Sequence, residues 1–310
     1  MSNLIVSPAP HIHSGNSTRK IMLDVLIALV PTIVASVFIF GVRSLAVIAV
    51  SVAAAVLSEY IFELICHRDI TIGDLSAAVT GVILALNVPV TIPLWQIALG
   101  DIFAIVIVKM MFGGIGKNFA NPAATARIFM LVSFGASMSP WSAAGDSITS
   151  GATPLTLNGD ALPSILDMLL GKHGGSLGET CTIALIIGGV YLIARKVITW
   201  HTPTAFIGTV FVFTLILSLC GYDIDPLYQI LSGGLFIGAI FMATDYSTSP
   251  NTSMGKILFG VGAGIITVVI RVFANLPEGV SYAILLMNIL TPYFSEWTRK
   301  KPFGGNVNEK

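Results

Sequence analysis

Residues 21–41 read IMLDVLIALVPTIVASVFIFG, and this stretch sets the class of fold. Asp24 is its only charged residue, and a run of about 20 mainly apolar residues is long enough to cross a bilayer as a helix. The whole chain has the same character, since its 310 residues are 55% hydrophobic and only 10% charged. A soluble domain carries about 25% charged residues. We therefore interpret the chain as an integral membrane protein.

Nine further apolar segments follow the first, and together they predict an all-α membrane protein of ten helices. The predicted spans are 21–41, 44–65, 73–93, 97–112, 121–138, 180–195, 203–220, 227–244, 255–273 and 279–297. They form two groups of five, at 21–138 and 180–297. A long polar loop at 139–179 separates the groups, with an arm at 1–20 and a tail at 298–310.

The two groups of spans resemble each other in pattern. Residues 81–93 and an apolar run ending at Lys109 match residues 234–250 and an apolar run ending at Arg271. Because each group holds an odd number of spans, the second copy is inverted relative to the first. Inverted repeats place a binding site near the midplane, at the interface between the copies. We predict two five-helix inverted repeats.

The distribution of lysine and arginine predicts the orientation. With the N-terminus in the cytoplasm, only Arg43, Lys172 and Arg271 fall in outside segments, and most of the others fall inside. This asymmetry satisfies the positive-inside rule. It predicts cytoplasmic termini and an extracytoplasmic loop at 139–179. Within that loop, residues 163–170 predict a short amphipathic helix lying on the membrane or on a partner.

The long loop contains the octet DSITSGAT at residues 146–153. Gly151 gives the backbone freedom, and Pro154 favours an extended conformation at Thr153, which presents the hydroxyl. Most Ser/Thr/Gly stretches are only loops. The alternative is that an enzyme recognises this octet and modifies Thr153.

A glycine-rich segment, FGGIGKNFANPAA, occupies residues 112–124. Gly113 and Gly114 can expose backbone N–H groups, Lys117 adds positive charge, and Pro122 can open the following helix. Together these features can hold an anionic group at a helix N-terminus. A tight turn between two helices explains the glycines equally well.

Several ionisable residues lie within or beside the predicted spans, where they are costly and usually functional. Glu59 lies well inside the second span. Asp245 could coordinate Na⁺ with nearby hydroxyls, although capping its own loop is the favoured reading. The remaining members lie nearer span ends and could extend to the interface; they are Asp24, Asp101, Lys109, Arg127 and Arg271.

Composition excludes several classes of function. The formal net charge is zero, which leaves no broad basic face for nucleic acid. Cys66, Cys181 and Cys220 are far apart and form no metal-ligand spacing, so a zinc or iron–sulfur site made by this chain alone is not expected. The sequence shows no Ser/His/Asp set and no carboxylate dyad, so hydrolase chemistry is not expected.

The octet resembles the flavin-transfer motif of the Rnf and Nqr respiratory complexes, with the spacing Asp-x-x-Thr-Ser-Gly-Ala-Thr. The N-terminal arm, the glycine-rich segment and residues 242–252 are also similar to that family. The resemblance implies a covalent FMN, attached by a phosphodiester to Thr153. It further implies that a flavin transferase recognises the other motif residues, namely Asp146, Ser150, Gly151 and Ala152. The length fits the Rnf D-type subunit better than the Nqr B-type subunit, which has a longer N-terminal region.

The resemblance also implies the function. Rnf complexes have six kinds of subunit and couple electron transfer between ferredoxin and NAD to Na⁺ or H⁺ movement across the bacterial or archaeal cytoplasmic membrane. This chain would be an electron-carrying subunit that is not catalytically complete alone. Its partners would include the FMN-bearing G subunit, the C subunit and membrane lipid. A non-covalent riboflavin is implied as well, with no site marked in the sequence. As contacts for an ion or a flavin we select Glu59, Gly113, Gly114, Lys117 and Asp245. Arg127 or Arg271 could also pair with a flavin phosphate or with a partner carboxylate.

Two other classes of function remain open at the level of sequence. A channel or carrier for a small solute can also have ten spans in an inverted repeat, because fold does not fix function. A passive scaffold for partner subunits is the third reading. The octet at 146–153 discriminates among them, since neither alternative has a reason to carry it.

Overall fold

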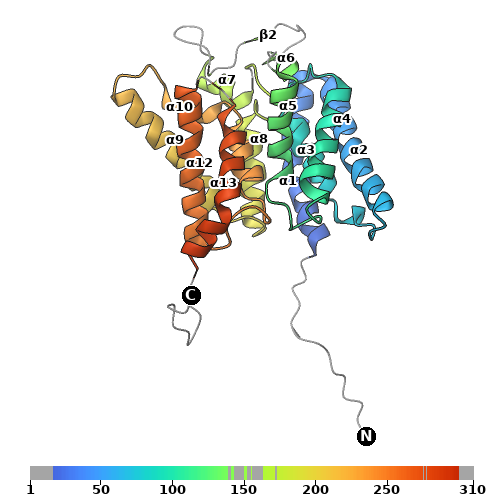
Figure 1. Cartoon of the computed structure of the whole chain (residues 1–310). Coiled ribbons are helices and arrows are strands. Elements are labelled where there is room, and N and C mark those ends of the chain that lie inside the picture. Colours follow the sequence, from blue (N-terminus) through green and yellow to red (C-terminus); the bar gives the residue numbers. More distant parts are fainter. Residues whose placement is uncertain are drawn as a thin grey trace, which may run out of the picture.

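The computed structural model describes residues 17–138, 141–142, 150–151, 155, 163–171, 173–274, 276 and 278–299. These residues form a bundle of helices, with one pair of two-residue strands at one end (Figure 1). The predicted helical membrane fold is confirmed at this level.

The first part of the chain supplies the helices at one side of the bundle. They are α1 (Thr18–Phe40), α2 (Val42–Ile65), the 3₁₀-helix η1 (Ile72–Asp74), α3 (Ser76–Leu86), α4 (Leu94–Ile102), the π-helix η2 (Phe103–Met110), α5 (Pro122–Ser133) and α6 (Gly135–Met138). The loop region adds β1 (Trp141–Ser142), β2 (Ser150–Gly151) and α7 (Ile165–Leu170).

The second part supplies the other side. Its elements are α8 (Thr182–Ala194), α9 (His201–Leu219), α10 (Pro226–Leu231), α11 (Leu235–Ile237), the π-helix η4 (Gly238–Met242), α12 (Ser253–Phe273) and α13 (Gly279–Trp297). The two parts meet where α1 packs against α8 and α5 packs against α13.

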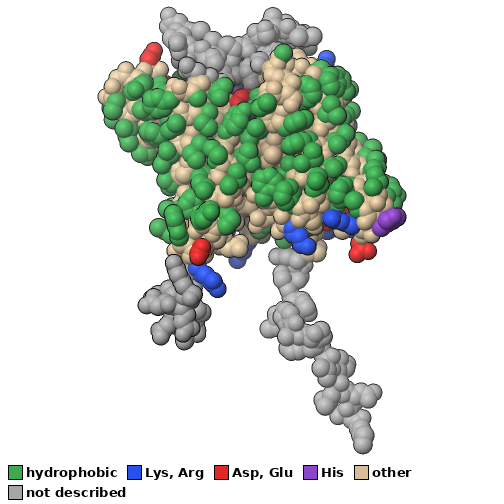
Figure 2. Space-filling view, in the orientation of Figure 1, with side chains coloured by type: hydrophobic (Ala, Val, Ile, Leu, Met, Phe, Trp, Pro, Cys, Tyr) green, Lys and Arg blue, Asp and Glu red, His purple; other side chains and the backbone are tan. Residues whose placement is uncertain are grey.

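Four of the described helices, α1, α2, α9 and α12, are each long and apolar enough to cross a membrane, and α3, α5 and α8 are shorter apolar helices. Hydrophobic side chains cover most of the visible face of the bundle, and most of the visible charged side chains gather at its lower end (Figure 2). This distribution fits a multi-pass membrane protein with an apolar belt facing lipid. The first residues of α1 and the last of α13 lie at that lower end, opposite β2 (Figure 1).

Three of the predicted spans are interrupted, and the one at 121–138 divides at Phe134 into α5 and α6. In place of a continuous span at 73–93, α3 ends at Leu86, with Asn87 as its C-cap. Two carbonyl groups at this end accept hydrogen bonds from residues that precede α8. The N–H of Leu177 donates to the carbonyl of Val88 (3.1 Å), and the N–H of Gly178 donates to the carbonyl of Leu86 (2.7 Å). The predicted span at 227–244 is broken between α10 and α11, where Gly233 and Gly234 have positive φ.

Small residues allow the helices to approach closely. A Cβ atom added at Gly188 in α8 would clash with the backbone carbonyl oxygen of Ala28 in α1. A Cβ atom at Gly81 in α3 would lie 3.0–3.1 Å from backbone atoms of Ser51 and Val52 in α2. Small residues at helix interfaces are a common means of tight packing within membranes.

Candidate functional site

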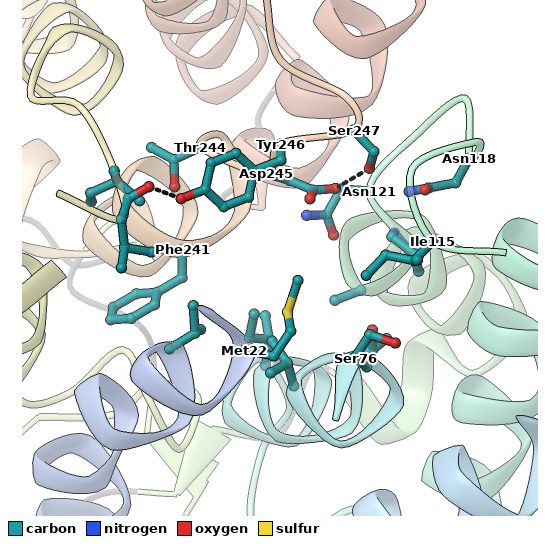
Figure 3. Close-up of a pocket in the computed structure, with 18 of the residues that line it drawn as sticks. Met22, Ser76, Ile115, Asn118, Asn121, Phe241, Thr244, Asp245, Tyr246 and Ser247 are labelled. Atoms are coloured by element: carbon teal, nitrogen blue, oxygen red, sulfur yellow. Dashed lines mark hydrogen bonds between the residues drawn. The ribbon is translucent and has the colours of Figure 1, made fainter. Parts of the chain in front are cut away.

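A cavity of about 90 Å³ lies between the two parts of the chain. It is bounded by α1, α3, η2 and the start of α5 on one side and by α8, η4 and the turn after η4 on the other (Figure 3). The polar residues of its wall are Ser76, Thr80, Lys109, Asn118, Asn121, Thr244, Asp245, Tyr246 and Ser247. The arrangement combines an apolar interior with side chains able to orient a polar ligand.

The glycine-rich segment forms part of this cavity, but not through the residues selected from the sequence. Gly113 and Gly114 have φ values of 111° and 90°. Their N–H groups donate to Met110 (3.1 Å) and Lys109 (3.1 Å), which ends η2. These bonds favour the tight turn at the two glycines. Lys117 is exposed and does not line the cavity.

Two buried asparagines of the same segment were missed by the sequence reasoning. Asn118 and Asn121 both line the cavity. The Asn121 side chain caps α5 by accepting from Ala124 N–H (3.1 Å), and it donates to the carbonyl of Met242 (3.1 Å) at the end of η4. Asn121 therefore joins the two parts. The available signal was its position before Pro122, since asparagine is a preferred N-cap.

Asp245 lies in the wall of the cavity and also caps its own loop. Its carboxylate accepts from the hydroxyls of Ser247 (3.0 Å) and Thr248 (3.2 Å). Burial raises the pKa of Asp245, and the hydrogen bonds from Ser247 oppose that rise. The capping interpretation of Asp245 fits these contacts.

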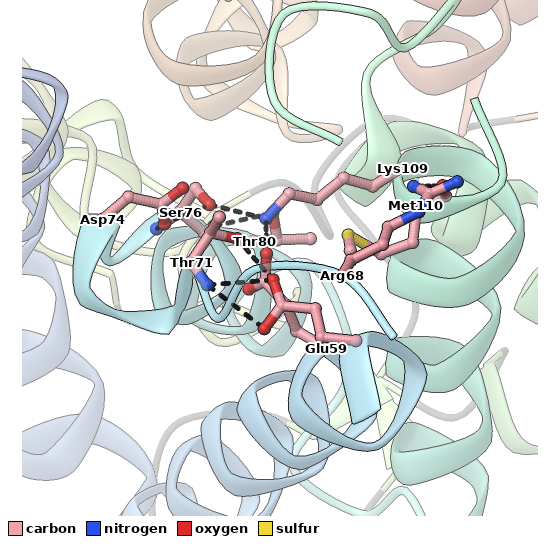
Figure 4. Close-up of polar contacts among 9 residues, drawn as sticks. Glu59, Arg68, Thr71, Asp74, Ser76, Thr80, Lys109 and Met110 are labelled. Atoms are coloured by element: carbon pink, nitrogen blue, oxygen red, sulfur yellow. Dashed lines mark hydrogen bonds and ion pairs between the residues drawn. The ribbon is translucent and has the colours of Figure 1, made fainter. Parts of the chain in front are cut away.

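Glu59 belongs to a buried polar network near the C-terminal ends of α2 and η2 and the start of α3 (Figure 4). Its Oε1 atom lies 2.7 Å from Nζ of Lys109, which also donates to Ser76 (2.5 Å). Ser76 in turn donates to Asp74 (2.6 Å). Lys109 could have extended to the interface, but it is buried, because the carboxylate of Glu59 gives its ammonium group a partner inside the protein.

The same correction applies to the other ionisable residues near span ends. Asp24, Asp101, Arg127 and Arg271 are only 6%, 0%, 1% and 7% exposed. Asp24 accepts from Tyr191 (3.0 Å) and pairs with Arg195 (3.3 Å). Three of the four find partners on other helices, and a single sequence does not reveal such partners.

A second group of buried charges lies at the opposite end of the bundle. Arg127 in α5 pairs with Glu278 and donates to the Asn87 side chain (2.9 Å). Arg271 in α12 donates to the carbonyl groups of three residues before α11, at 2.6, 3.0 and 2.9 Å; these are Gln229, Ser232 and Gly233. The carboxylate of Glu179 accepts from the N–H of Gly233. We call this group the outer cluster, and it joins both parts of the chain; its members are Asn87, Arg127, Glu179, Arg271 and Glu278.

Leu155, two residues after the octet, lies beside this outer cluster. Asp146, Ala152 and Thr153 lie outside the described residues. Ser150 and Gly151 form β2, which pairs antiparallel with β1 through Ser142–Ser150 and Trp141–Gly151. Leu155 lies beside Gly233, since a Cβ atom added at Gly233 would be 2.7 Å from its Cδ1 atom. The predicted helix at 163–170 is confirmed as α7, and Tyr228 holds its start by donating to the carbonyl of Pro163 (2.8 Å).

Comparison with known proteins gives matches over almost the whole chain. The profile of the NQR2, RnfD, RnfE family matches residues 5–304. The D subunit of the Na(+)-translocating ferredoxin:NAD(+) oxidoreductase complex of Acetobacterium woodii is 42% identical, over 97% of this chain and 96% of the relative. The D subunit of the proton-translocating complex of Clostridium ljungdahlii is 41% identical, over 96% of each chain. The D subunit of the ion-translocating oxidoreductase complex of Alcanivorax borkumensis is 32% identical, over 97% of each chain.

Proposed function

Since the chain belongs to the NQR2, RnfD, RnfE family, we propose that it is the D-type membrane subunit of an ion-translocating ferredoxin:NAD⁺ oxidoreductase complex. The observation that carries this proposal is the full-length similarity to two such subunits, at 42% and 41% identity. The coupling ion is Na⁺ or H⁺, since the two relatives are named for different ions. No feature of the described residues favours a channel or scaffold without a redox role, so neither is proposed.

We further propose that the subunit carries electrons through FMN attached to Thr153. The flavin supplies one- and two-electron transfer, and the protein supplies its position and electrostatic surroundings. The octet supports the attachment, and the flanking residues support an anchored segment. β2 pairs with β1 just before Thr153, and Leu155 packs at the outer cluster just after it. The G subunit, the C subunit and a flavin transferase are the partners that this reading requires.

The attachment is tested by replacing the proposed acceptor in protein made together with a flavin transferase. Thr153→Ala is expected to abolish the flavin fluorescence of the denatured band, because no hydroxyl remains to be esterified. Thr156→Ala removes a neighbouring hydroxyl outside the octet and is expected to keep the fluorescence. Mass spectrometry of the peptide that contains residue 153 gives the direct readout. Wild-type fluorescence in the Thr153→Ala band would exclude this attachment site.

The cavity between the two parts is our proposed site for the non-covalent riboflavin. An isoalloxazine ring needs both apolar contact and hydrogen-bonding groups, and the wall offers Phe241 as well as Asn118, Asn121 and Asp245. A ring is larger than the present cavity, so binding requires the exposed side chains of Ile115 and Tyr246 to move. Asn121→Leu is expected to lower the riboflavin content of the purified complex without changing the covalent flavin. Unchanged riboflavin content would reject this site.

We propose that the bundle is built from two inverted five-helix repeats that give ten membrane passages. The matching interruptions support this: α3 in the first part and α11–η4 in the second are short elements that precede a longer helical segment. The residues that follow each are bound by a later helix of the same part: Arg127 of α5 donates to the side chain of Asn87 (2.9 Å), and Thr291 of α13 donates to the carbonyl of Thr248 (2.8 Å).

The native cysteines test the topology that follows, with cytoplasmic termini and an extracytoplasmic flavin loop. Cys66 and Cys220 are both exposed, at the ends of α2 and α9 that face opposite sides in this topology. In intact cells, a membrane-impermeant maleimide is expected to label Cys220 and to leave Cys66 unlabelled until the membrane is opened. The reverse pattern would contradict the orientation.

A further inference from the structure

Asp101 is a buried acid to which the proposed electron transfer gives no role. It lies in α4, is fully buried, and neither of its carboxyl oxygens has a hydrogen-bond partner among the described residues. Ser51 of α2 is the polar side chain that faces it. The Ser51 hydroxyl donates instead to the carbonyl of Gly81 (2.8 Å), so it does not donate a hydrogen bond to the Asp101 carboxyl group.

The charged groups around Asp101 are all engaged elsewhere. The elements packed against α4 are α2, α3, α5 and η2, of which α3 carries no charged residue. Glu59 of α2 pairs with Lys109 of η2, and Arg127 of α5 pairs with Glu278. The remaining ionisable side chains of these helices lie near the ends of α2: Arg43 donates to carbonyls of residues 90 and 91, Glu63 accepts from Thr71, and Tyr60 is exposed. Asp101 therefore has no counter-ion in the described structure.

A carboxylate without a counter-ion or a donor is very unfavourable in a membrane interior, so such a group takes up a proton. A protonated Asp101 can donate to the free lone pair of the Ser51 oxygen, whose own proton is held by Gly81. The protonated form can thus donate to Ser51, whereas the ionised form accepts no hydrogen bond in the described structure while the Ser51 hydroxyl donates to Gly81. A bound Na⁺ would need several oxygen ligands, and Ser51 alone does not supply them.

The partner of Ser51 is next in the chain to a residue of the cavity wall. Thr80 lines the cavity wall, and the next residue, Gly81, accepts the Ser51 hydrogen bond. Glu59 lies eight positions after Ser51 in α2, and Lys109 lies eight positions after Asp101 in the continuous segment α4–η2. Eight helical residues correspond to a rise of about 12 Å along the helix axis. The π-helix η2 begins at Phe103, two residues after Asp101, and π-segments often mark functional sites.

We propose that Asp101 is a proton-binding site on the ion path of this subunit, with Ser51 as the hydrogen-bond partner of its protonated form. The step moves a proton only: the carboxyl O–H bond breaks, a water molecule that reaches the site accepts the proton, and the electrons travel separately. The proposal rests on the proposed function, because it requires an ion-translocating complex.

The decisive variant is Asp101→Asn, which has the shape of the protonated acid but cannot release a proton. In the purified complex in liposomes, we expect it to keep its flavins and electron transfer while ion transport per electron falls at least tenfold. Asp101→Glu is expected to recover part of that loss, and Ser51→Ala to slow transport severalfold. Asp69→Asn, at an exposed acid, is the control. Wild-type transport in Asp101→Asn would overturn the proposal, whereas absent transport in the unmodified complex would overturn the proposed function itself.

Carbodiimide labelling tests the protonated state without relying on activity. Dicyclohexylcarbodiimide reacts with protonated carboxyl groups in apolar surroundings, and we expect mass spectrometry to find the adduct on Asp101 and to find that Ser51→Ala changes its rate of formation. If Asp101 stays unlabelled while Glu59 reacts, the site is not a protonated acid. If Na⁺ protects Asp101 from labelling, the bound ion is Na⁺ and the assignment to H⁺ is wrong.

Discussion

The two buried charge groups differ in what they join. The network around Glu59 and Lys109 lies within the first part of the chain, among α2, α3 and η2. The outer cluster around Arg127 and Glu278 crosses from the first part to the second. The glycines show the same division, since Gly81 brings together two helices of one part and Gly188 brings together one helix from each. Contacts within a part define its internal structure, whereas contacts between parts fix their relative position.

The largest expected effect comes from breaking the charge pair between the parts. Arg127→Leu leaves Glu278 and Asn87 without their partner, and breaking a buried pair from one side costs roughly 3–5 kcal/mol. We expect a lower midpoint of thermal unfolding in detergent and poor accumulation of the protein. The double variant Arg127→Leu with Glu278→Gln is expected to recover part of that loss. If the double variant is no better than the single one, the pair is not what joins the parts.

A smaller effect is expected from separating α1 and α8. Gly188→Ala forces a Cβ atom against the Ala28 carbonyl, and such overpacking typically costs about 1–3 kcal/mol. Gly208→Ala in α9 is the matched control, because a Cβ atom there meets nothing within 4 Å. The control is expected to be neutral or slightly stabilising, by up to about 1 kcal/mol. Equal thermal stability of the two variants would show that the contact between α1 and α8 is loose.

The smallest effect concerns Asp245 at the cavity between the parts. Its pKa is raised in the folded protein, so the folded state binds more protons than the unfolded state between the two pKa values. Stability should therefore fall as the pH rises from about 4, the ordinary value for aspartate, through the higher folded pKa. Asp245→Asn removes this titration, and its unfolding midpoint should depend less on pH in that window. An unchanged pH profile would mean that Asp245 is equally solvated in both states.

The sequence predicted the membrane class and the long helices well, because apolar runs such as 21–41 and 255–273 have no other stable environment. It did not predict the breaks at Asn87 and at Gly233–Gly234, where the apolar character continues but the backbone turns. Those turns are stabilised by residues far along the chain. The N–H groups of Leu177 and Gly178 donate to carbonyl groups at the end of α3. Before α11, Arg271 donates to the carbonyl of Gly233, and Glu179 accepts from its N–H.

The candidate site was predicted unevenly for the same reason. The octet at 146–153 is a local pattern, so one sequence is enough to recognise it. The partnership of Glu59 with Lys109 joins residues fifty positions apart, and neither side chain indicates the other in a linear reading. Asp101 was grouped with residues that extend to the interface because its depth and its lack of a partner are properties of the packed bundle.

Two neighbours in the chain hold opposite parts of the molecule. The N–H of Gly178 donates to the carbonyl of Leu86 at the end of α3, at 2.7 Å, while the carboxylate of Glu179 accepts from Gly233 just before α11. These two bonds tie the end of α3 in the first part to the segment before α11 in the second, so losing either one would loosen the contact between the parts at the end of the bundle that holds the outer cluster.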